Sequence, residues 1–480
     1  MRSLGPVLCV LACVFSAHGQ EQFGMAHGNY AGVDAAALNP ARLAGQWPYA
    51  SIRLLGADLF VWNNLVALSG KDHTLVGEVR DGMSGASGDI VLRGSLRSDV
   101  KRGSVLAQLA GPAFSLSLGK GTVSAGVRAR SLTSLSGISP ELGRFIFHGL
   151  GYDPQHGVRY RDEGTRALTA AWSEVNVSYA RILSSEGFAL ISAGASLRYQ
   201  QAHFGGALAL DVLDYTVHDT ARATIHELGG SFGYSSPASN AGRGWGADLG
   251  VQYERTMEEA DRYLPHHAST GCRPMPYRYR IGLSLLDLGG NYFKGAIGGH
   301  VEMGSTTIAD HNAVDLDGAE GLDSLLGTVV NWERADKFRI GNPTAVSMQY
   351  DQRVIDRVYV ACALVQQLSS RHGTRLRRPN SIAITPRFDT RWFEASVPIV
   401  VHEYGFSRPS VGLMLRFSDV LIGSDHILPF LTRPNVSGAD LYFRVRITLA
   451  RSPFCKGKRK SGARHASGST EALPCIIPGE

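Results

Sequence analysis

The sequence predicts an all-β protein, a closed transmembrane antiparallel β-barrel of about 14 strands with an N-terminal plug segment inside it. The first observation is the composition. Glycine makes up 56 of 480 residues and charged residues 19%, whereas a soluble domain has about 7% glycine and about 25% charged residues. The second is apolar–polar alternation with a period of two, the pattern of a β-strand. The third is the length of the alternating runs, about nine to eleven residues, which suits a tilted strand crossing a bilayer.

Composition also excludes other classes of protein. The chain is 44% apolar and 9% aromatic, which is too rich in core-forming residues for a disordered protein. Six cysteines in 480 residues, two of them among the first 15, are too few for a small protein held together by disulfides. We therefore expect a large β-fold.

Residues 1–19 have the features of a secretory signal peptide. Arg2 supplies the positive charge, residues 4–15 form an apolar run, and Ala17-His18-Gly19 has the small–x–small pattern of a cleavage site. The apolar run is shorter than the roughly 20 residues that a spanning helix needs. The sequence therefore predicts an exported protein that is integral to a bacterial outer membrane, without a helical span.

Residues 20–46 are expected to fold into the barrel as a plug or hatch. Between residues 24 and 46 the only formal charges are those of Asp34 and Arg42, besides the titratable His27. A free arm of this composition would expose apolar surface to water. Inside the barrel, Asp34 is expected to meet an arginine of the wall, because neither charge is then buried alone.

A turn is expected within this segment at Asn39-Pro40-Ala41. Pro40 is suited to start a turn and Asn39 to cap it. The turn would direct the chain into the first strand of the barrel, which we expect near Tyr49.

Residues 47–450 are expected to form the barrel wall. In one run, the row Tyr277, Tyr279, Ile281, Leu283 and Leu285 is predicted to face lipid, and Arg278, Arg280 and Ser284 to face the lumen. Similar alternation occurs near 122–130, 173–181, 191–200, 344–351, 357–366, 380–389, 391–400, 409–417 and 441–449, and more weakly near 64–69 and 419–424.

The polar face of these runs is rich in arginine and nearly free of lysine. Arginine suits a crowded, partly dry interior because its guanidinium forms bidentate pairs and stacks on neighbours. A large secreted sandwich or solenoid, with this face in water, is the alternative. The residues expected to face the lumen are Arg128, Arg130, Glu174, Arg198, Arg278, Arg280, Arg387, Asp389, Glu394, Arg416, Arg444 and Arg446.

Longer segments between the runs are expected to be the outer loops, and short ones the periplasmic turns. An even strand number would leave both termini in the periplasm. Within one loop, Ser139 is expected to cap a helical turn that has Pro140 at its first position. The expected outer loops are 70–103, 136–166, 204–243, 258–275 and 304–341.

A series of short motifs resembles a family of bacterial outer-membrane barrels that is known only as a domain of unknown function. That family is similar to the PorV and PorQ proteins and to the FadL long-chain fatty-acid transporter group. The resemblance implies the barrel fold, an outer-membrane location and, from the FadL group, a hatch at residues 20–46. The motifs are Gly28-Asn29-Tyr30-Ala31-Gly32-Val33, Ala37-Leu38-Asn39-Pro40-Ala41, Trp62-Asn63-Asn64, Gly137-Ile138-Ser139-Pro140-Glu141-Leu142, Ala171-Trp172-Ser173-Glu174, Gly282-Leu283-Ser284-Leu285-Leu286-Asp287-Leu288-Gly289-Gly290, Asn342-Pro343-Thr344-Ala345 and Ser437-Gly438-Ala439-Asp440-Leu441-Tyr442-Phe443.

No catalytic constellation or cofactor motif was found, so we expect neither an enzyme nor a cofactor. The loop with His266, His267 and Cys272 is a weak candidate for a metal site. An acidic loop is a second candidate, because calcium is bound by dense oxygen ligands, although its spacing differs from that of an EF-hand. Its residues are Asp315, Asp317, Glu320 and Asp323.

Residues 451–480 are expected to form a basic, disordered periplasmic tail, with six Lys and Arg against two Glu. Contact with anionic lipid or a cell-wall polymer is the alternative, and nucleic acid is not expected as a partner of an exported protein. Cys455 and Cys475 are candidates for a disulfide in the oxidising periplasm. Cys362 continues an apolar row and is expected to be an ordinary wall residue.

Two functions are compatible with these features of the sequence. The first is a channel or transporter for small apolar or amphipathic compounds. The second is a barrel that anchors secretion or surface proteins, as the resemblance to PorV implies. An apolar groove beside residues 20–46 would favour transport, and a lumen sealed by arginine–carboxylate pairs would favour anchoring.

Overall fold

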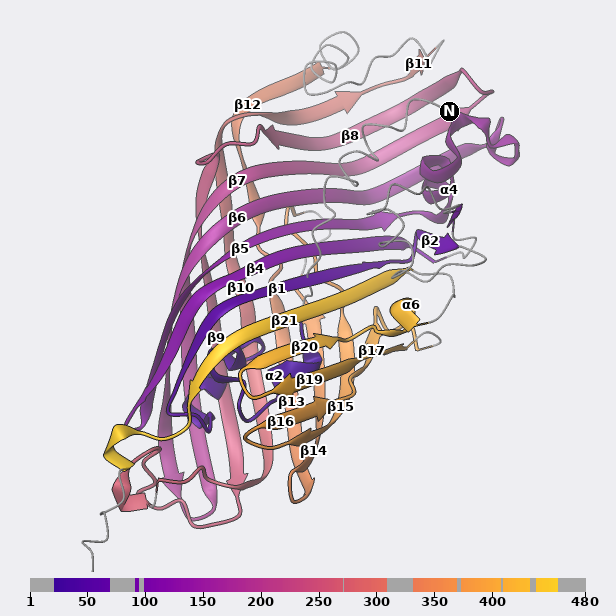
Figure 1. Cartoon of the computed structure of the whole chain (residues 1–480). Helices are drawn as coiled ribbons and strands as arrows, with labels where there is room; N and C mark the ends of the chain where they lie inside the picture. The colour runs from indigo at the N-terminus through magenta and orange to yellow at the C-terminus, as the bar shows by residue number, and fades with distance from the viewer. Residues whose placement is uncertain are drawn as a thin grey trace, which may run out of the picture.

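The computed structural model of the protein is a closed antiparallel β-barrel of 14 strands (Figure 1). The structure describes residues 21–69, 91–94, 99–270, 272–308, 331–368, 373–406, 409–431 and 437–455. The predicted signal peptide and acidic loop lie outside this part of the chain, and so does the predicted basic tail from residue 456 onward.

Seven strands run away from the end where the chain enters the barrel, and seven return. The outgoing strands are β1 (Ala50–Asn63), β5 (Gly121–Ile138), β7 (Ala189–Val217), β10 (Tyr277–Met303), β14 (Val358–Gln367), β16 (Phe393–Ser396) continued by β17 (Ile399–His402), and β20 (Val420–Ser424). The returning strands are β4 (Lys101–Leu118), β6 (Arg159–Glu186), β8 (Ala223–Ser235) continued by β9 (Gly242–Thr256), β12 (Asn331–Gly341) continued by β13 (Ala345–Ile355), β15 (Ser381–Asp389), β18 (Ser410–Val411) continued by β19 (Leu413–Phe417), and β21 (Gly438–Leu449). The short β11 (Thr306–Ile308) pairs with β8, while β2 (Val66–Ser69) and β3 (Val91–Gly94) form a separate two-stranded sheet.

The first and last strands close the barrel. Ile52 of β1 pairs with Phe114 of β4 on one side and with Ile447 of β21 on the other. Because Ala50 lies opposite Leu449, the chain enters and leaves the wall at the same end, as an even strand number requires.

The strands on one side of the barrel are much longer than predicted. β6, β7 and β10 have 28, 29 and 27 residues, whereas about ten residues suffice to cross a bilayer. In Figure 1, β6 and β7 extend together with β8 far to the upper right, away from the shorter strands β14 to β17 at the lower right. The expected outer loop 204–243 is therefore mostly strand, because it contains the end of β7 and all of β8.

A β-bulge reverses part of one predicted strand. Ile281 and Leu283 are exposed by 48% and 46%, and Arg280 and Ser284 are buried. Tyr277 is fully buried and Arg278 is exposed, the opposite of the prediction. The pairing of β10 with β9 shifts by one residue between Tyr277 and Tyr279, and such a bulge exchanges the two faces of a strand. Arg278 therefore does not face the interior.

Helices are short and lie in the connections and at the N-terminus. In the part of the chain that the structure describes, no helix has the length and apolar character to span a membrane. Ser139 caps α4 (Pro140–His148) by accepting a hydrogen bond from the Leu142 N–H at 3.0 Å, as predicted. The other helices are α2 (Phe23–Ala26), α6 (Leu428–Leu431) and short 3-10 turns that include η1 (Gly32–Ala37), η2 (Pro40–Gly45), η3 (Gly149–Gly151), η4 (Asp153–Gln155), η5 (Ala268–Thr270) and η7 (Pro453–Cys455).

The connection from β9 to β10 is at the opposite end from the one predicted. Ala189 lies opposite Arg255, so the connection emerges beside the short β6–β7 turn and both ends of the wall. Cys272 in this connection forms a disulfide with Cys455. The suggested partner Cys475 lies outside the described residues, and the disulfide also removes Cys272 as a metal ligand. Cys362 is a free, exposed residue of the wall.

Candidate functional site in the barrel interior

Residues 21–46 lie inside the barrel, against the inner faces of many strands (Figure 1). Phe23 and Leu38 are almost fully buried and pack on apolar residues of β14, β15 and β17. At the start of the segment, Asp425 accepts hydrogen bonds from the backbone N–H groups of Phe23 and Gly24, at 2.6 and 3.1 Å. The segment is thus held by side chains of the wall rather than by strand pairing.

The predicted turn is held at its centre by Asn39. The Asn39 side-chain oxygen accepts a hydrogen bond from the Ala41 N–H at 2.9 Å, and Pro40 begins η2. The Asn39 amide nitrogen donates to the Val251 carbonyl and to Oε1 of Gln349, both at 3.0 Å. Both the oxygen and the nitrogen of this buried side-chain amide therefore have hydrogen-bond partners, as burial requires.

Three glycines of adjacent strands make room for this turn. A Cβ on Gly194 of β7 would lie 2.6 Å from the Pro40 carbonyl carbon. One on Gly250 of β9 would lie 2.9 Å from Cδ of Pro40, and one on Gly282 of β10 would lie 2.8 Å from Nδ2 of Asn39. Real Cβ atoms do not approach other atoms so closely, so the wall needs glycine here for the close approach of another backbone.

Asp34 meets three arginines of the wall. Its carboxylate lies 2.6 Å from Nη1 of Arg53, and 3.5 and 3.8 Å from the guanidinium nitrogens of Arg444 and Arg446. All four side chains are more than nine-tenths buried. Arg444 also pairs with Asp58, and Arg446 donates to the Ala31 carbonyl at 2.6 Å. The charge of the segment is compensated, which offsets the large cost of burying it.

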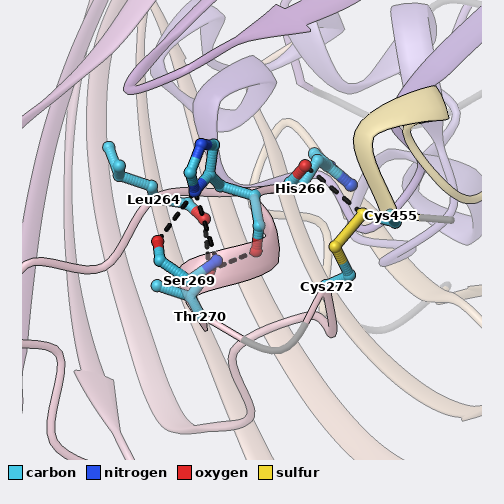
Figure 2. The surroundings of a disulfide bond; sticks show 7 residues. Leu264, His266, Ser269, Thr270, Cys272 and Cys455 are labelled. Carbon is cyan, nitrogen blue, oxygen red and sulfur yellow. Dashed lines mark hydrogen bonds between the residues drawn. A yellow bond between two sulfur atoms is a disulfide. The ribbon is translucent and has the colours of Figure 1, made fainter. Parts of the chain in front are cut away.

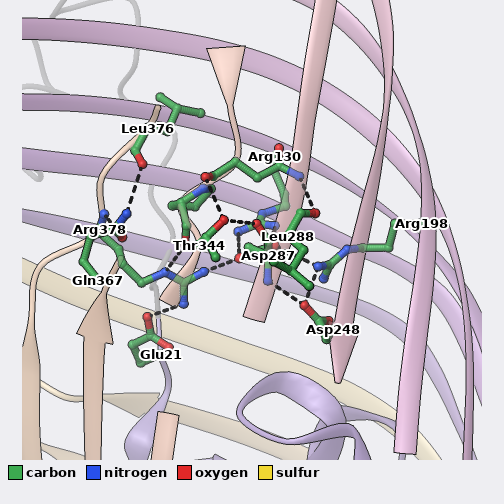
Figure 3. Close-up of polar contacts among 12 residues, drawn as sticks. Glu21, Arg130, Arg198, Asp248, Asp287, Leu288, Thr344, Gln367, Leu376 and Arg378 are labelled. Carbon is green, nitrogen blue, oxygen red and sulfur yellow. Dashed lines mark hydrogen bonds and ion pairs between the residues drawn. The ribbon is translucent and has the colours of Figure 1, made fainter. Parts of the chain in front are cut away.

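A second ionic cluster centres on Asp287 (Figure 3). Its carboxylate contacts Arg130 at 2.9 Å and Arg198 at 3.0 Å, and also pairs with Arg378. Arg198 is shared with Asp248 at 2.5 Å. Arg378 reaches the N-terminal segment through Glu21 at 2.8 Å, so this cluster joins β5, β7, β9 and β10 to the β14–β15 connection and to the N-terminal segment.

A third group of charges surrounds Asn29. Arg280 donates to the Asn29 side-chain oxygen at 2.7 Å and pairs with Glu254 at 2.6 Å. Asp389 accepts a hydrogen bond from the Asn29 N–H at 2.9 Å and contacts Arg416 at 3.3 Å. The middle of the segment is therefore fixed by charge-assisted hydrogen bonds, which are stronger than neutral ones.

The residues that the sequence assigned to the lumen are mostly buried and ion-paired. Arg128 is partly exposed at its side chain and binds the buried Glu174. Arg278 is the exception described above. The others are at most 7% exposed, namely Arg130, Arg198, Arg280, Arg387, Asp389, Glu394, Arg416, Arg444 and Arg446.

Several members of these clusters were not identified from the sequence. Asp287 lies where the alternation of β10 fails, at a register shift between Leu285 and Leu288. Asp58 lies in β1, and the sequence predicted only where this strand begins. Arg378 lies between β14 and β15, where the chain has no periodic pattern to interpret. The other missed members are Glu21, Arg53, Asp248 and Glu254. Asp351, which pairs with Arg387 at 3.0 Å, was also not among the residues assigned to the lumen.

An apolar layer lies beyond the ionic clusters. Leu132 is two residues beyond Arg130 on β5, farther from the end where the chain enters, and pairs with Leu106 of β4. Trp172 packs in this layer and lies under the Arg130 guanidinium, 5.2 Å from its ring centre. The layer comprises Phe60, Leu106, Leu132, Leu168, Ala170, Trp172, Ala202, Ala207, Ala241, Phe293, Ala296, Ile340 and Leu376.

Two small cavities flank the N-terminal segment. One, of about 10 Å³, is lined by Glu21 and Phe23 together with Phe60, Trp62 and Asp440. The other, of about 20 Å³, is near Ala44 to Trp47 at the opposite end of the segment. Each has room for about one water molecule. Within the described residues, no group of three metal-ligating side chains was found.

Fold and interior define a membrane-type β-barrel: apolar side chains cover its outer face, and its interior is occupied by the N-terminal part of its own chain. Residues 84–425 match the profile described as "Family of unknown function (DUF5723)", and the chain therefore belongs to this family. No curated protein matches the sequence.

Several solved structures are similar to the chain. A TodX mutant, a monoaromatic hydrocarbon channel, is 12% identical, with 90% of this chain and 99% of that chain covered at a TM-score of 0.41. The Ralstonia pickettii toluene transporter TbuX is 11% identical, with 91% and 98% covered at a TM-score of 0.40. A Pseudomonas aeruginosa FadL homologue is 8% identical, with 90% and 98% covered at a TM-score of 0.22. At these values the likeness carries no information about a ligand.

Proposed function

We propose that this protein is an outer-membrane channel for small apolar or amphipathic compounds, closed in the present conformation by residues 21–46. The observation that carries the proposal is the way the segment is held. It fills the interior through side-chain contacts such as Asp34–Arg53 and Asn39–Gln349, and closure of the wall does not depend on it, because β1 pairs directly with β4 and β21. A segment of this kind is able to move without opening the barrel.

The chemistry of the interior supports an apolar cargo. A compound entering from the side of the long strands would meet the apolar layer around Leu106, Leu132 and Trp172 before the ionic clusters. Apolar surface favours removal of apolar compounds from water. The ionic clusters and the segment would then form the barrier that has to open.

Deletion of residues 24–44 tests the gating step. The variant should retain a heat-stable barrel and raise the permeability of liposomes to small solutes, compared with the full chain reconstituted at equal density. A folded variant with unchanged permeability would remove the proposed gate.

Binding to the apolar layer is tested separately with toluene, a small apolar compound. Trp172 is 1% exposed, so toluene entering this layer should change its fluorescence in the full chain. The same titration in Trp172→Phe is the control. A response that persists in this variant would place the toluene elsewhere.

An anchoring barrel is the second candidate, and a specific observation favours it. Arginine–carboxylate clusters at Asp34 and Asp287 tie the segment to the wall, and the two cavities described beside the segment are each of about the size of a water molecule. If the deletion variant is impermeable and toluene does not bind, a closed barrel that presents its long strands to partner proteins is the better explanation.

A further inference from the structure

The connection between β9 and β10 crosses the end of the barrel. We call residues 257–270 and 272–276 the strap. In the strand order, β10 and β21 lie on opposite sides of the barrel, with β1, β4, β5, β6, β7 and β9 between them on one path. The disulfide between Cys272 of the strap and Cys455, six residues after the end of β21, therefore ties the strap to the far side (Figure 2).

The strap covers the last part of the N-terminal segment. Ala260 is fully buried, and Tyr263 and Met275 pack on the same apolar cluster as Leu43 and Ala44 of the segment. Tyr263 and Met275 also line the cavity of about 20 Å³ that adjoins Ala44. The strap thus closes the gap between the segment and the inner faces of β6, β7 and β9.

The second half of the strap is held by the disulfide, by packing of Met275 and by an ion pair between Arg273 and Glu258 at 2.5 Å. Of these contacts, the disulfide is the one that joins the strap to the far side of the barrel. Next to the disulfide, the His266 ring packs edge-on against Tyr49, with ring centres 5.6 Å apart. The sulfur of Cys455 lies 3.4 Å from the His266 carbonyl oxygen. These contacts join the strap to the chain just before β1 and just after β21.

The strap backbone is not in its preferred conformation. Arg262, His266 and Cys272 have φ angles of 58°, 58° and 49°, a left-handed region that is unfavourable for residues other than glycine. Surrounding contacts have to maintain such a conformation. In the first half they include the Ala260 N–H donating to the Gly187 carbonyl at 2.6 Å. The disulfide has this role in the second half.

We propose that the strap and the Cys272–Cys455 disulfide form a redox-controlled closure over residues 31–46 of the N-terminal segment. The oxidised form keeps the strap on the segment, and reduction lets the strap relax and that part of the segment move. Both cysteines are partly exposed, so a reductant has access to them. This inference rests on the proposed function in one respect only, which is that movement of the segment would let a compound pass through the barrel.

The chemical step is exchange with a dithiol. One thiolate of the dithiol attacks a sulfur of the protein disulfide, releases the other cysteine as a thiolate and forms a mixed disulfide. The second thiol of the reductant then displaces the remaining cysteine. Two electrons pass from the dithiol, which becomes a disulfide, and the two cysteines take up two protons.

Hydrogen exchange of the full chain in lipid nanodiscs tests the closure, with dithiothreitol as the dithiol. Exchange in residues 31–46 should become about tenfold faster on reduction, because local opening that the crosslink forbids is then allowed. Residues 23–29, held by Asp425 and Asp389, should be unchanged. Cys272→Ser should show the fast exchange without reductant, and Cys362→Ser should behave as the parent protein does.

The possible results separate the inference from the proposed function. Faster exchange with unchanged liposome permeability supports the strap and contradicts the channel. Faster exchange with increased permeability supports both. Unchanged exchange after complete reduction, or a parent protein in which alkylation and mass analysis find Cys455 joined to Cys475 instead, would overturn the redox closure.

Discussion

Substitution of Asp287 by asparagine should destabilise the barrel strongly. Arg198 and Arg378 have second carboxylates in Asp248 and Glu21, whereas the only ion pair found for Arg130 in the described residues is with Asp287. The Arg130 and Asp287 side chains are each 6% exposed. Leaving one partner of such a buried pair without the other costs about 3–5 kcal/mol. Asparagine keeps the size of the side chain and tolerates the left-handed backbone at this position, where φ is 51°.

The assay is unfolding by guanidinium chloride in lipid vesicles, followed by tryptophan fluorescence. Glu163→Gln is the matched control. The side chains of Glu163 and its partner Arg161 are 67% and 48% exposed, so this ion pair should contribute less than about 1 kcal/mol to the free energy of unfolding. A double variant, Asp287→Asn with Arg130→Met, should recover most of the loss because no charge of the pair remains. A loss for Asp287→Asn as small as the control's, or a double variant that costs the sum of the two single ones, would refute this reasoning.

The remaining predictions concern the segment, the wall and the strap. Gly250→Ala should destabilise docking of the N-terminal segment by about 1–3 kcal/mol, the usual cost of overpacking, whereas Gly151→Ala, with open space around it, should not; hydrogen exchange of residues 31–46 measures both. Asn39→Ala removes three hydrogen bonds, each worth about 1 kcal/mol, and should speed exchange in the same residues. A spin label at Leu283 should be reached by a lipid-soluble quencher and one at Ser284 should not, and equal quenching would contradict the register of β10. Burial lowers the pKa of His266, so the histidine binds a proton less readily in the folded strap than in the unfolded chain. The stability of the strap should therefore fall as the pH drops below about 6.5, the usual pKa of histidine. In His266→Phe, the hydrogen-exchange rates of the strap should lose this pH dependence.

The alternation predicted the wall well where strands are regular. Leu283 and Ser284 lie on opposite faces, as a period of two requires, and most of the arginines of the polar rows are buried inside. The pattern failed at Tyr277, because a bulge depends on the number of residues in the partner strand and has no local signal of its own.

The partners of the buried arginines were harder to predict. Periodicity assigns a residue to a face, but it contains no information about which strands meet across the interior. Asp287 and Arg130 are 157 positions apart, and Arg378 lies in a segment without a period. The length of β6 and β7 was missed for a related reason, since beyond the bilayer neither face of a strand has to be apolar.

The connection from β9 to β10 was assigned to the wrong end from its length alone. Long connections are typical of the outer end of such barrels. Here the long strands already extend that end, and the long β9–β10 connection instead lies beside Cys455. The end of the barrel at which this connection emerges is determined by the number of strands that precede it, and not by the length of the connection.

The contacts of the N-terminal segment also constrain how the protein is assembled. Gln22 binds Arg444, 422 positions away, and the Phe23 N–H donates to Asp425, 402 positions away. A chain made from its N-terminus has to be almost complete before these partners exist, and contacts this distant in sequence form slowly because of the loop that must be closed. The segment therefore reaches its final position only in the last stage of folding, when β21 joins β1. Until then its buried apolar and charged groups need protection from water and from other chains, so the proteins that escort unfolded barrels have to hold the beginning of this chain the longest.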